Sequence, residues 1–156
     1  MVFERAAIDD IQQLTALRIA YLTEDHGALE RDALRSIEAN LPDYFRKHLN
    51  RDLIAYAARE GREIVACVFL LILEKPLSPA FLTGRIGNIL NVYTRPDHRR
   101  RGCARCLLEM AMKDAVDFNL SSIELKATED GYDLYRSLGF VDDASKYHAM
   151  KWTVGT

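Results

Sequence analysis

The chain has 156 residues, of which 49% are hydrophobic, and its formal net charge is −2 at pH 7. This is enough to bury the core of one domain over residues 1–156 without disulfides or a structural metal. Three cysteines, an odd number, provide no disulfide framework and suit a reducing compartment. The longest apolar run, Ile64 to Leu73, is too short to span a bilayer, and no signal peptide is evident. We therefore expect a cytoplasmic protein with no membrane partner.

The first half of the sequence predicts strands and helices from hydrophobic periodicity. In chain order they are a strand over Val2 to Ala6, a helix opening at Ile8-Asp9-Asp10, a helix across Ala28 to Leu49 that is interrupted near Pro42, and two strands, Leu53 to Arg59 and Arg62 to Leu73. Glu60-Gly61 between the two strands indicates a hairpin.

The second half continues the alternation of strands and helices, without repeats. The expected elements are a loop at Pro76-Leu77-Ser78-Pro79, a strand over Arg85 to Thr94, a helix over Gly102 to Phe118, a strand over Ile123 to Ala127, a short helix capped by Thr128 and ended by Gly139, and closing strands at Phe140-Val141 and Tyr147 to Val154.

The turn before the second-half helix is strongly basic. Five arginines and one aspartate lie between Arg95 and Arg105, a local charge of +4 on a chain of net charge −2. Such a concentration of positive charge favours an anionic ligand.

The helix after this turn has an apolar face, with Leu108, Ala111 and Ala115 at helical spacing. The turn therefore opens a helix N-terminus, where unpaired N–H groups and the helix dipole bind phosphate. Gly102 and Ala104 are small enough to let a pyrophosphate approach the backbone.

Three segments together resemble the GNAT superfamily of N-acetyltransferases. Arg99-Arg100-Arg101-Gly102-Cys103-Ala104 is similar to its signature of Arg or Gln, two residues, Gly, one residue, then Gly or Ala. Val92-Tyr93-Thr94-Arg95-Pro96 resembles the family's fourth strand and its exit, and Tyr135-Arg136-Ser137-Leu138-Gly139-Phe140 resembles its late helix and following strand. The segments follow the family's order across roughly a third of the chain.

The resemblance implies an α+β fold in three layers. Its central mixed sheet, mostly antiparallel, would have about seven strands, splayed between the fourth and fifth, with about four flanking helices. It also implies acetyl-CoA as co-substrate, with the thioester pointing at Leu90 and Asn91. The residues implied for acetyl-CoA binding are Val92, Tyr93 and Thr94 along the pantetheine, and Arg99, Arg100, Arg101, Gly102, Cys103, Ala104 and Arg105 around the pyrophosphate.

The resemblance assigns Tyr135 as the group that protonates or hydrogen-bonds the departing CoA sulfur. Without the resemblance, a half-buried aromatic side chain that packs is the simpler interpretation. The general base stays open among Glu124, Asn91 holding a water, and the region of Tyr21 and His26. Glu124 has the best position in the family, and its alternative role is that of an ordinary solvated carboxylate.

Two other functions compete for the same segment. Cys103-Ala104-Arg105-Cys106 is a C-x-x-C at a helix N-terminus, typical of thiol oxidoreductases. Phosphate binding explains the arginines and Gly102, which a dithiol site does not, so we expect both cysteines to pack as small hydrophobes. A nucleic-acid-binding module would need an extended basic stripe with aromatic residues between the basic ones, which the arginine cluster lacks. The sequence pI of about 6.1 also argues against such a module.

No metal is expected, because His98, Cys103 and Cys106 lack a fourth ligand at suitable spacing. The expected partners are acetyl-CoA and an amine acceptor, either a small molecule or a peptide N-terminus, with a homodimer left open. Residues that could line the acceptor pocket are Tyr21, Glu24, Asp25, His26 and Tyr44. An acidic set of this kind would favour a cationic amine.

Overall fold

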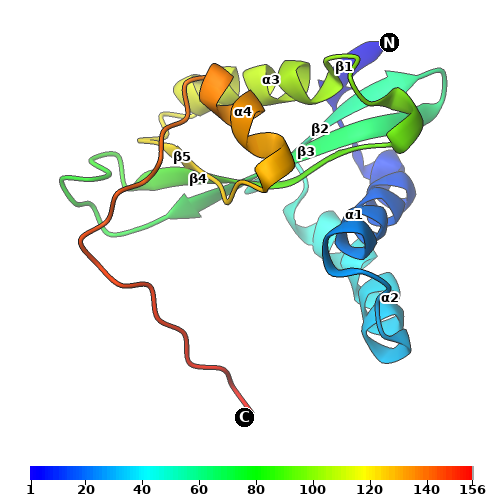
Figure 1. Cartoon of the computed structure of the whole chain (residues 1–156), viewed down its shortest axis with the longest axis horizontal. Coiled ribbons are helices and arrows are strands. Elements are labelled where there is room, and N and C mark those ends of the chain that lie inside the picture. Colours follow the sequence, from blue (N-terminus) through cyan, green and yellow to red (C-terminus); the bar gives the residue numbers. More distant parts are fainter. Residues whose placement is uncertain (156) are drawn as a thin grey trace. The chain divides into compact units, whose positions relative to one another are not determined.

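A five-stranded sheet organises residues 1–126 in the computed structural model, which describes residues 1–155 (Figure 1). The strands are β1 (Val2–Arg5), β2 (Leu53–Glu60), β3 (Glu63–Glu74), β4 (Arg85–Thr94) and β5 (Ile123–Glu124), in the order β1-β2-β3-β4-β5. The first three pairings are antiparallel, and β4 pairs with β5 in parallel. The mixed α+β class predicted from the sequence is confirmed.

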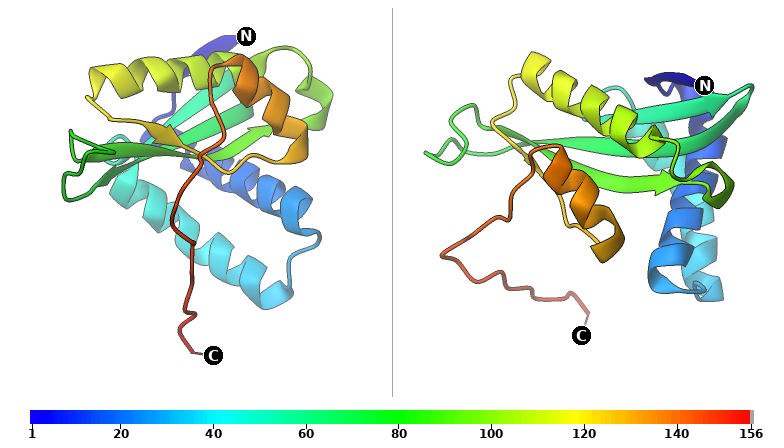
Figure 2. Two further views of the ribbon diagram at one scale, coloured as in Figure 1. Left: turned by 60° about the vertical axis from the view of Figure 1, so that its left-hand side comes forward. Right: turned by 45° about the horizontal axis from the view of Figure 1, so that its top comes forward.

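Helices cover both faces of this sheet, which gives the first unit three layers (Figure 2). On one face lie α1 (Ile11–His26), entered through the short 3-10 helix η1 (Ile8–Asp10), and α2 (Arg31–His48). On the other face lies α3 (Cys103–Asp117), preceded by the 3-10 helix η2 (Pro96–His98). No helix among the described residues is long and apolar enough to cross a membrane.

The central strands β2 and β3 are buried along most of their length because helices shield both of their faces. Leu14, Phe45 and Phe69 belong to one buried cluster, which α1 and α2 share with the sheet. Leu107 and Leu108 of α3 are fully buried as well. The core thus fixes the frame from which β4 and the following turn emerge.

The pairing of β4 with β5 is short, and this opens the sheet. The two strands are paired only at Gly87 with Ile123 and at Asn88 with Glu124. Beyond this point β4 continues to Thr94 with β3 on one side alone. The sheet is therefore splayed between the fourth and fifth strands, as the resemblance implied.

The second compact unit begins at Ala127 and contains α4 (Glu129–Ser137). Thr128 caps this helix, since its side chain accepts a hydrogen bond from the Gly131 N–H at 3.3 Å. Gly139 follows the helix with φ +99°, a backbone conformation that glycine adopts without strain. Both ends of the helix agree with the sequence prediction.

The closing strands predicted at Phe140-Val141 and Tyr147 to Val154 are wrong, and the sheet has five strands instead of about seven. Met150, Trp152 and Val154 alternate in a strand-like pattern, yet they are 93%, 82% and 82% exposed. An alternating pattern becomes a strand only when a neighbouring strand pairs with its backbone and its apolar face is covered.

Two boundaries also differ from the sequence prediction. The helix α2 continues through Pro42 without interruption. Proline removes one hydrogen-bond donor, and the packing of Leu41 and Phe45 against the core outweighs that loss. The strand predicted over Ile123 to Ala127 ends at Glu124, because β5 pairs with β4 over two residues only.

Candidate functional site

The basic turn between β4 and α3 contains two residues in the left-handed region. Arg100 has φ +60° and Gly102, the residue that caps α3, has φ +79°. Left-handed residues beside right-handed ones can turn successive backbone N–H groups toward a common point, an arrangement that binds anions. The side chains of Arg99, Arg100 and Arg101 in this turn are exposed.

The first turn of α3 adds further N–H donors next to the basic turn. The Cys106 N–H is the first that donates within the helix, to the Gly102 carbonyl at 3.1 Å. The amides of Cys103 and Ala104 precede it and face the helix end, where the dipole favours negative charge. A Cβ added to Gly102 would meet nothing within 4 Å, so the space at that position of the turn is open.

The arginines of the turn divide into two groups. Arg99 donates to the Thr94 carbonyl at 2.9 Å and to the Glu24 carboxylate of α1 at 2.6 Å. Arg105 lies 3.9 Å from Glu109 on the same helix. Arg100 and Arg101 are exposed and form no ion pair with any other residue in 1–155. Arg99 therefore joins the turn to α1, whereas Arg100 and Arg101 are available to an anion.

His98 holds the turn from beneath. It is 8% exposed, and its ring nitrogens lie 2.9 Å from Asp97 Oδ1 and 2.7 Å from Glu60 Oε2 of β2. The hydrogen bonds to Glu60 and Asp97 raise the pKa of His98 above its ordinary value of 6.5. The charged imidazolium bonded to both carboxylates therefore persists to higher pH than it would in an unperturbed histidine.

We predict that the clamp formed by the hydrogen bonds of His98 to Glu60 and Asp97 weakens as the pH rises. A raised pKa in the folded state means that the stabilisation is complete below pH 6.5 and is lost as the pH rises through the raised value. The ring signals of His98 in an NMR titration should show a pKa above 6.5, and His98→Gln should remove the corresponding pH dependence of unfolding. A His98 pKa at or below 6.5 would contradict the proposed clamp.

The two cysteines of the C-x-x-C sequence do not form a reactive pair. Cys103 is 3% exposed, and burial raises the pKa of its thiol, which disfavours the thiolate that redox chemistry needs. Both Cys103 and Cys106 are free thiols. Among the described residues, no group of three or more His, Cys, Asp or Glu side chains could hold a metal. These observations favour the packing role over a dithiol site.

The open part of β4 contains a β-bulge. Tyr93 pairs with Cys67 and Leu90 pairs with Phe69, so that Asn91 and Val92 together oppose a single residue of β3. Asn91 has φ +56° and is 3% exposed. A bulge leaves a residue outside the ladder and redirects the strand, a device often found beside active sites. Val92, Tyr93 and Thr94 lie on the stretch that follows, toward the basic turn.

The Asn91 side chain is held by two groups from other elements. Its amide nitrogen donates to Cys67 Sγ at 3.3 Å, and its oxygen accepts from the Arg18 guanidinium of α1 at 3.3 Å. Burial raises the pKa of the Cys67 thiol to about 12, so this sulfur stays protonated. Asn91 is therefore a fixed, uncharged group at the bulge.

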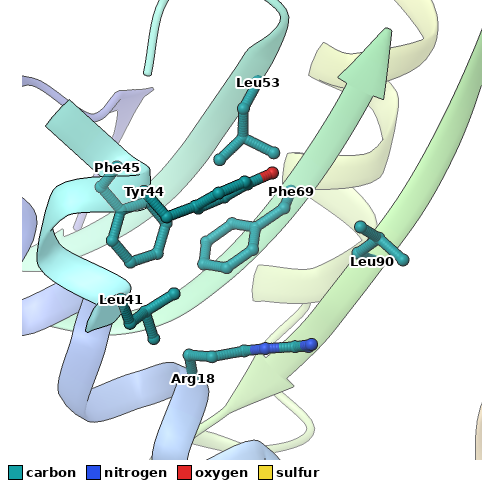
Figure 3. Close-up of a pocket in the computed structure, with 7 residues that line it drawn as sticks. All are labelled: Arg18, Leu41, Tyr44, Phe45, Leu53, Phe69 and Leu90. Carbon is teal, nitrogen blue, oxygen red and sulfur yellow. The ribbon is translucent and has the colours of Figure 1, made fainter. Parts of the chain in front are cut away.

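A pocket of about 240 Å³ opens beside the bulge, under α1 and α2 (Figure 3). Its charged lining residue is Arg18, whose side chain extends toward Leu90 of β4 in the close-up. The remaining lining is apolar or aromatic and comprises Leu41, Tyr44, Phe45, Leu53, Phe69 and Leu90.

The residues predicted to line an acceptor pocket separate in the structure. Tyr44 lines the pocket, and Tyr21 lies under the Arg18 guanidinium at 5.7 Å. Glu24 is bonded to Arg99, and Asp25 lies 3.4 Å from His26 at the exposed end of α1. An acidic pocket does not form from this set.

The three predicted catalytic residues have different environments. Asn91 is buried at the bulge, whereas Glu124 is exposed at the end of β5. Tyr135 belongs to the second unit, is 8% exposed and packs edge-on against Phe140 with ring centroids 6.0 Å apart. The sequence prediction missed Arg18, since its role depends on a contact with a residue 73 positions away.

A family model described as the acetyltransferase (GNAT) family matches residues 11–140. The match covers most of the chain and includes the bulged strand, the basic turn and α4. The chain belongs to the GNAT acetyltransferase family. Comparison with curated proteins found no match.

Solved structures share the fold of this GNAT chain. A predicted acetyltransferase with acetyl-CoA from Clostridium acetobutylicum is 28% identical, with a TM-score of 0.84 over 96% of this chain and 95% of the other. A GCN5-related N-acetyltransferase from Ralstonia eutropha is 24% identical, with a TM-score of 0.80 and coverage of 96% and 97%. A ribosomal-protein-alanine N-acetyltransferase from Brucella melitensis is 22% identical, with a TM-score of 0.70 and coverage of 97% and 100%. The last two support the fold alone.

Proposed function

We propose that this protein transfers an acetyl group from acetyl-CoA to a primary amine by direct attack in a ternary complex. The observation that carries the proposal is the open stretch of β4, which continues past Asn88 through the Asn91 bulge to Thr94, just before the basic turn. An extended pantetheine could pair with Val92, Tyr93 and Thr94 as a missing strand would. The similar structure from Clostridium acetobutylicum was solved with acetyl-CoA, which supports the same donor here.

The diphosphate end of the donor fits the turn by charge and by backbone geometry. The amides of residues 102–105 would bind its oxygens, and Arg100 and Arg101 would add charge-assisted hydrogen bonds. Arg99 would act mainly by holding the turn to Glu24 and Thr94. Cys103 and Ala104 contribute backbone donors, and the buried Cys103 thiol packs beneath them.

The chemistry requires a new C–N bond and the breaking of the thioester C–S bond. The acceptor amine attacks the acetyl carbonyl near Leu90 and Asn91, and it loses a proton to a base. Glu124, or a water held by Asn91, is proposed for that role. Tyr135 is proposed to give a proton or a hydrogen bond to the CoA thiolate. Binding that positions the two reactants supplies much of the acceleration.

We expect the isolated protein to bind acetyl-CoA and to label a primary amine from radioactive acetyl-CoA. Calorimetry should give micromolar or tighter affinity, about −8 kcal/mol or more favourable, as expected for several charge-assisted phosphate contacts. A panel of amines would identify the acceptor. If the protein does not bind acetyl-CoA but binds single-stranded RNA with an affinity that falls steeply with salt, the result would instead support a nucleic-acid-binding module.

The proposed place of action is the cytoplasm. Cys67, Cys103 and Cys106 are free thiols, two of them buried, as expected for a protein kept in a reducing compartment.

A further inference from the structure

The pocket beside the bulge combines a single cation with an apolar wall. Among the described residues that line it, Arg18 is the only charged one. Leu41, Phe45 and Phe69 line it together with Tyr44, whose pKa is raised mainly by burial. Such a lining has room for an apolar group and offers no carboxylate to a cationic one.

Arg18 is held in place without charge compensation. Its guanidinium donates to the neutral Asn91 amide and lies over the Tyr21 ring. It forms no ion pair within 4 Å with any carboxylate in residues 1–155. A guanidinium has five donors in a planar fork that matches a carboxylate, so this one retains capacity for an anionic ligand.

The position of Arg18 restricts where that anion can be on the acceptor. Arg18 lies 3.3 Å from Asn91, the bulge residue at which the acetyl carbonyl is expected. A carboxylate bound by Arg18 is therefore close to the site of amine attack. In an α-amino acid the amine and the carboxylate are attached to the same carbon. Its carboxylate can therefore bind Arg18 while its amine lies close to the acetyl carbonyl.

The apolar side of the pocket then receives the side chain of the acceptor. Leu41, Phe45 and Phe69 lie on the α2 and β3 side of Arg18 (Figure 3). The volume of about 240 Å³ is below the range of about 300 to 1,000 Å³ for drug-sized ligands. A small amino acid with an apolar or aromatic side chain fits these limits.

We propose that the acceptor is a free α-amino acid with an apolar or aromatic side chain, whose carboxylate binds Arg18. The inference rests on the proposed function and goes beyond it by choosing a free amino acid over a peptide N-terminus. A peptide presents an amide at the carbon where the free amino acid presents its carboxylate. That amide carries no charge for Arg18.

The test compares three acceptors with the same aromatic body: L-phenylalanine, L-phenylalaninamide and phenethylamine. L-phenylalanine should have the highest kcat/KM, because it alone has the carboxylate. The amide has a less basic amine, with more of it in the reactive free form, so amine basicity cannot produce this order.

Arg18→Gln should lower kcat/KM for L-phenylalanine about tenfold, mainly through KM. The same substitution should change kcat/KM for phenethylamine by less than about twofold. Arg46→Gln, an exposed arginine of α2 that pairs with Asp43, is the matched control and should change neither. A loss for all three acceptors after Arg18→Gln would show damage to Asn91 instead of carboxylate recognition, and would overturn the proposal.

Binding measurements distinguish failure of the amino-acid proposal from failure of the proposed acetyltransferase function. Calorimetry of L-phenylalanine with the CoA-saturated protein should give a Kd that Arg18→Gln weakens about tenfold. If acetyl-CoA binds but phenylalaninamide is the better acceptor, the amino-acid proposal is wrong and the acetyltransferase proposal stands. If acetyl-CoA does not bind, the proposed function fails first.

Discussion

Gly102→Leu is expected to weaken acetyl-CoA binding by about 100-fold or more. The leucine side chain would occupy the open space in front of the turn, where a Cβ on Gly102 meets no atom within 4 Å. It would separate the diphosphate from the amides of the first turn of α3. Losing two charge-assisted hydrogen bonds of about 1.5 to 3 kcal/mol each accounts for this magnitude. Calorimetry with acetyl-CoA measures it directly.

The substitution also strains the backbone, and this effect needs its own control. Gly102 has φ +79°, so a side chain there costs about 1 to 2 kcal/mol of stability whether or not ligand is bound. Gly61, in the β2–β3 hairpin, has φ +61° and open space around its Cβ position. Gly61→Leu should therefore lose similar stability and keep acetyl-CoA affinity. Equal affinities for the two variants would remove Gly102 from the binding site.

The turn could be predicted from the sequence because its signals are local. Five arginines, a glycine and an amphipathic helix lie within a few residues of one another. The bounds of β4 agree with the prediction for the same reason, since Arg85 to Thr94 is a strand-like stretch between a loop and a charged turn. Local composition and periodicity determine such elements.

The bulge and the pocket could not be predicted in this way. The bulge arises from the register between β3 and β4, where Asn91 and Val92 share one partner, and no local pattern encodes that register. The sequence analysis did not single out Arg18, because its contact with Asn91 exists only after α1 has packed on the sheet. Likewise, the sequence analysis considered Glu24 as a residue that could line the acceptor pocket, but in the structure its carboxylate accepts a hydrogen bond from Arg99.

Near the end of the chain, the sequence analysis predicted a strand that the structure does not contain. Met150, Trp152 and Val154 carry a clear period of two, and the sequence prediction converted it into a strand. The described residues provide no ladder partner for them, and they stay exposed. Periodicity predicts which face of a strand is buried, but pairing decides whether the strand exists.

Tyr135→Phe is expected to lower kcat by about 100-fold, the usual size of the effect of one general acid, with little change in acetyl-CoA affinity. The substitution removes only the hydroxyl. The ring would keep its edge-on contact with Phe140 and its place against Gly131, where an added Cβ would lie 2.9 Å from the Tyr135 ring. The melting temperature should therefore stay close to that of the parent protein.

Tyr132, one turn earlier in α4, provides the matched control for Tyr135. Its hydroxyl donates to the two oxygens of Asp142 at 3.0 and 3.1 Å, within the same unit. Tyr132→Phe removes an identical group from the same helix and should leave kcat unchanged. A kcat of Tyr135→Phe equal to that of the parent, with chemistry shown to be rate-limiting, would remove Tyr135 from the mechanism. The CoA thiolate would then take its proton from solvent, and catalysis would rest on positioning at the β4 bulge.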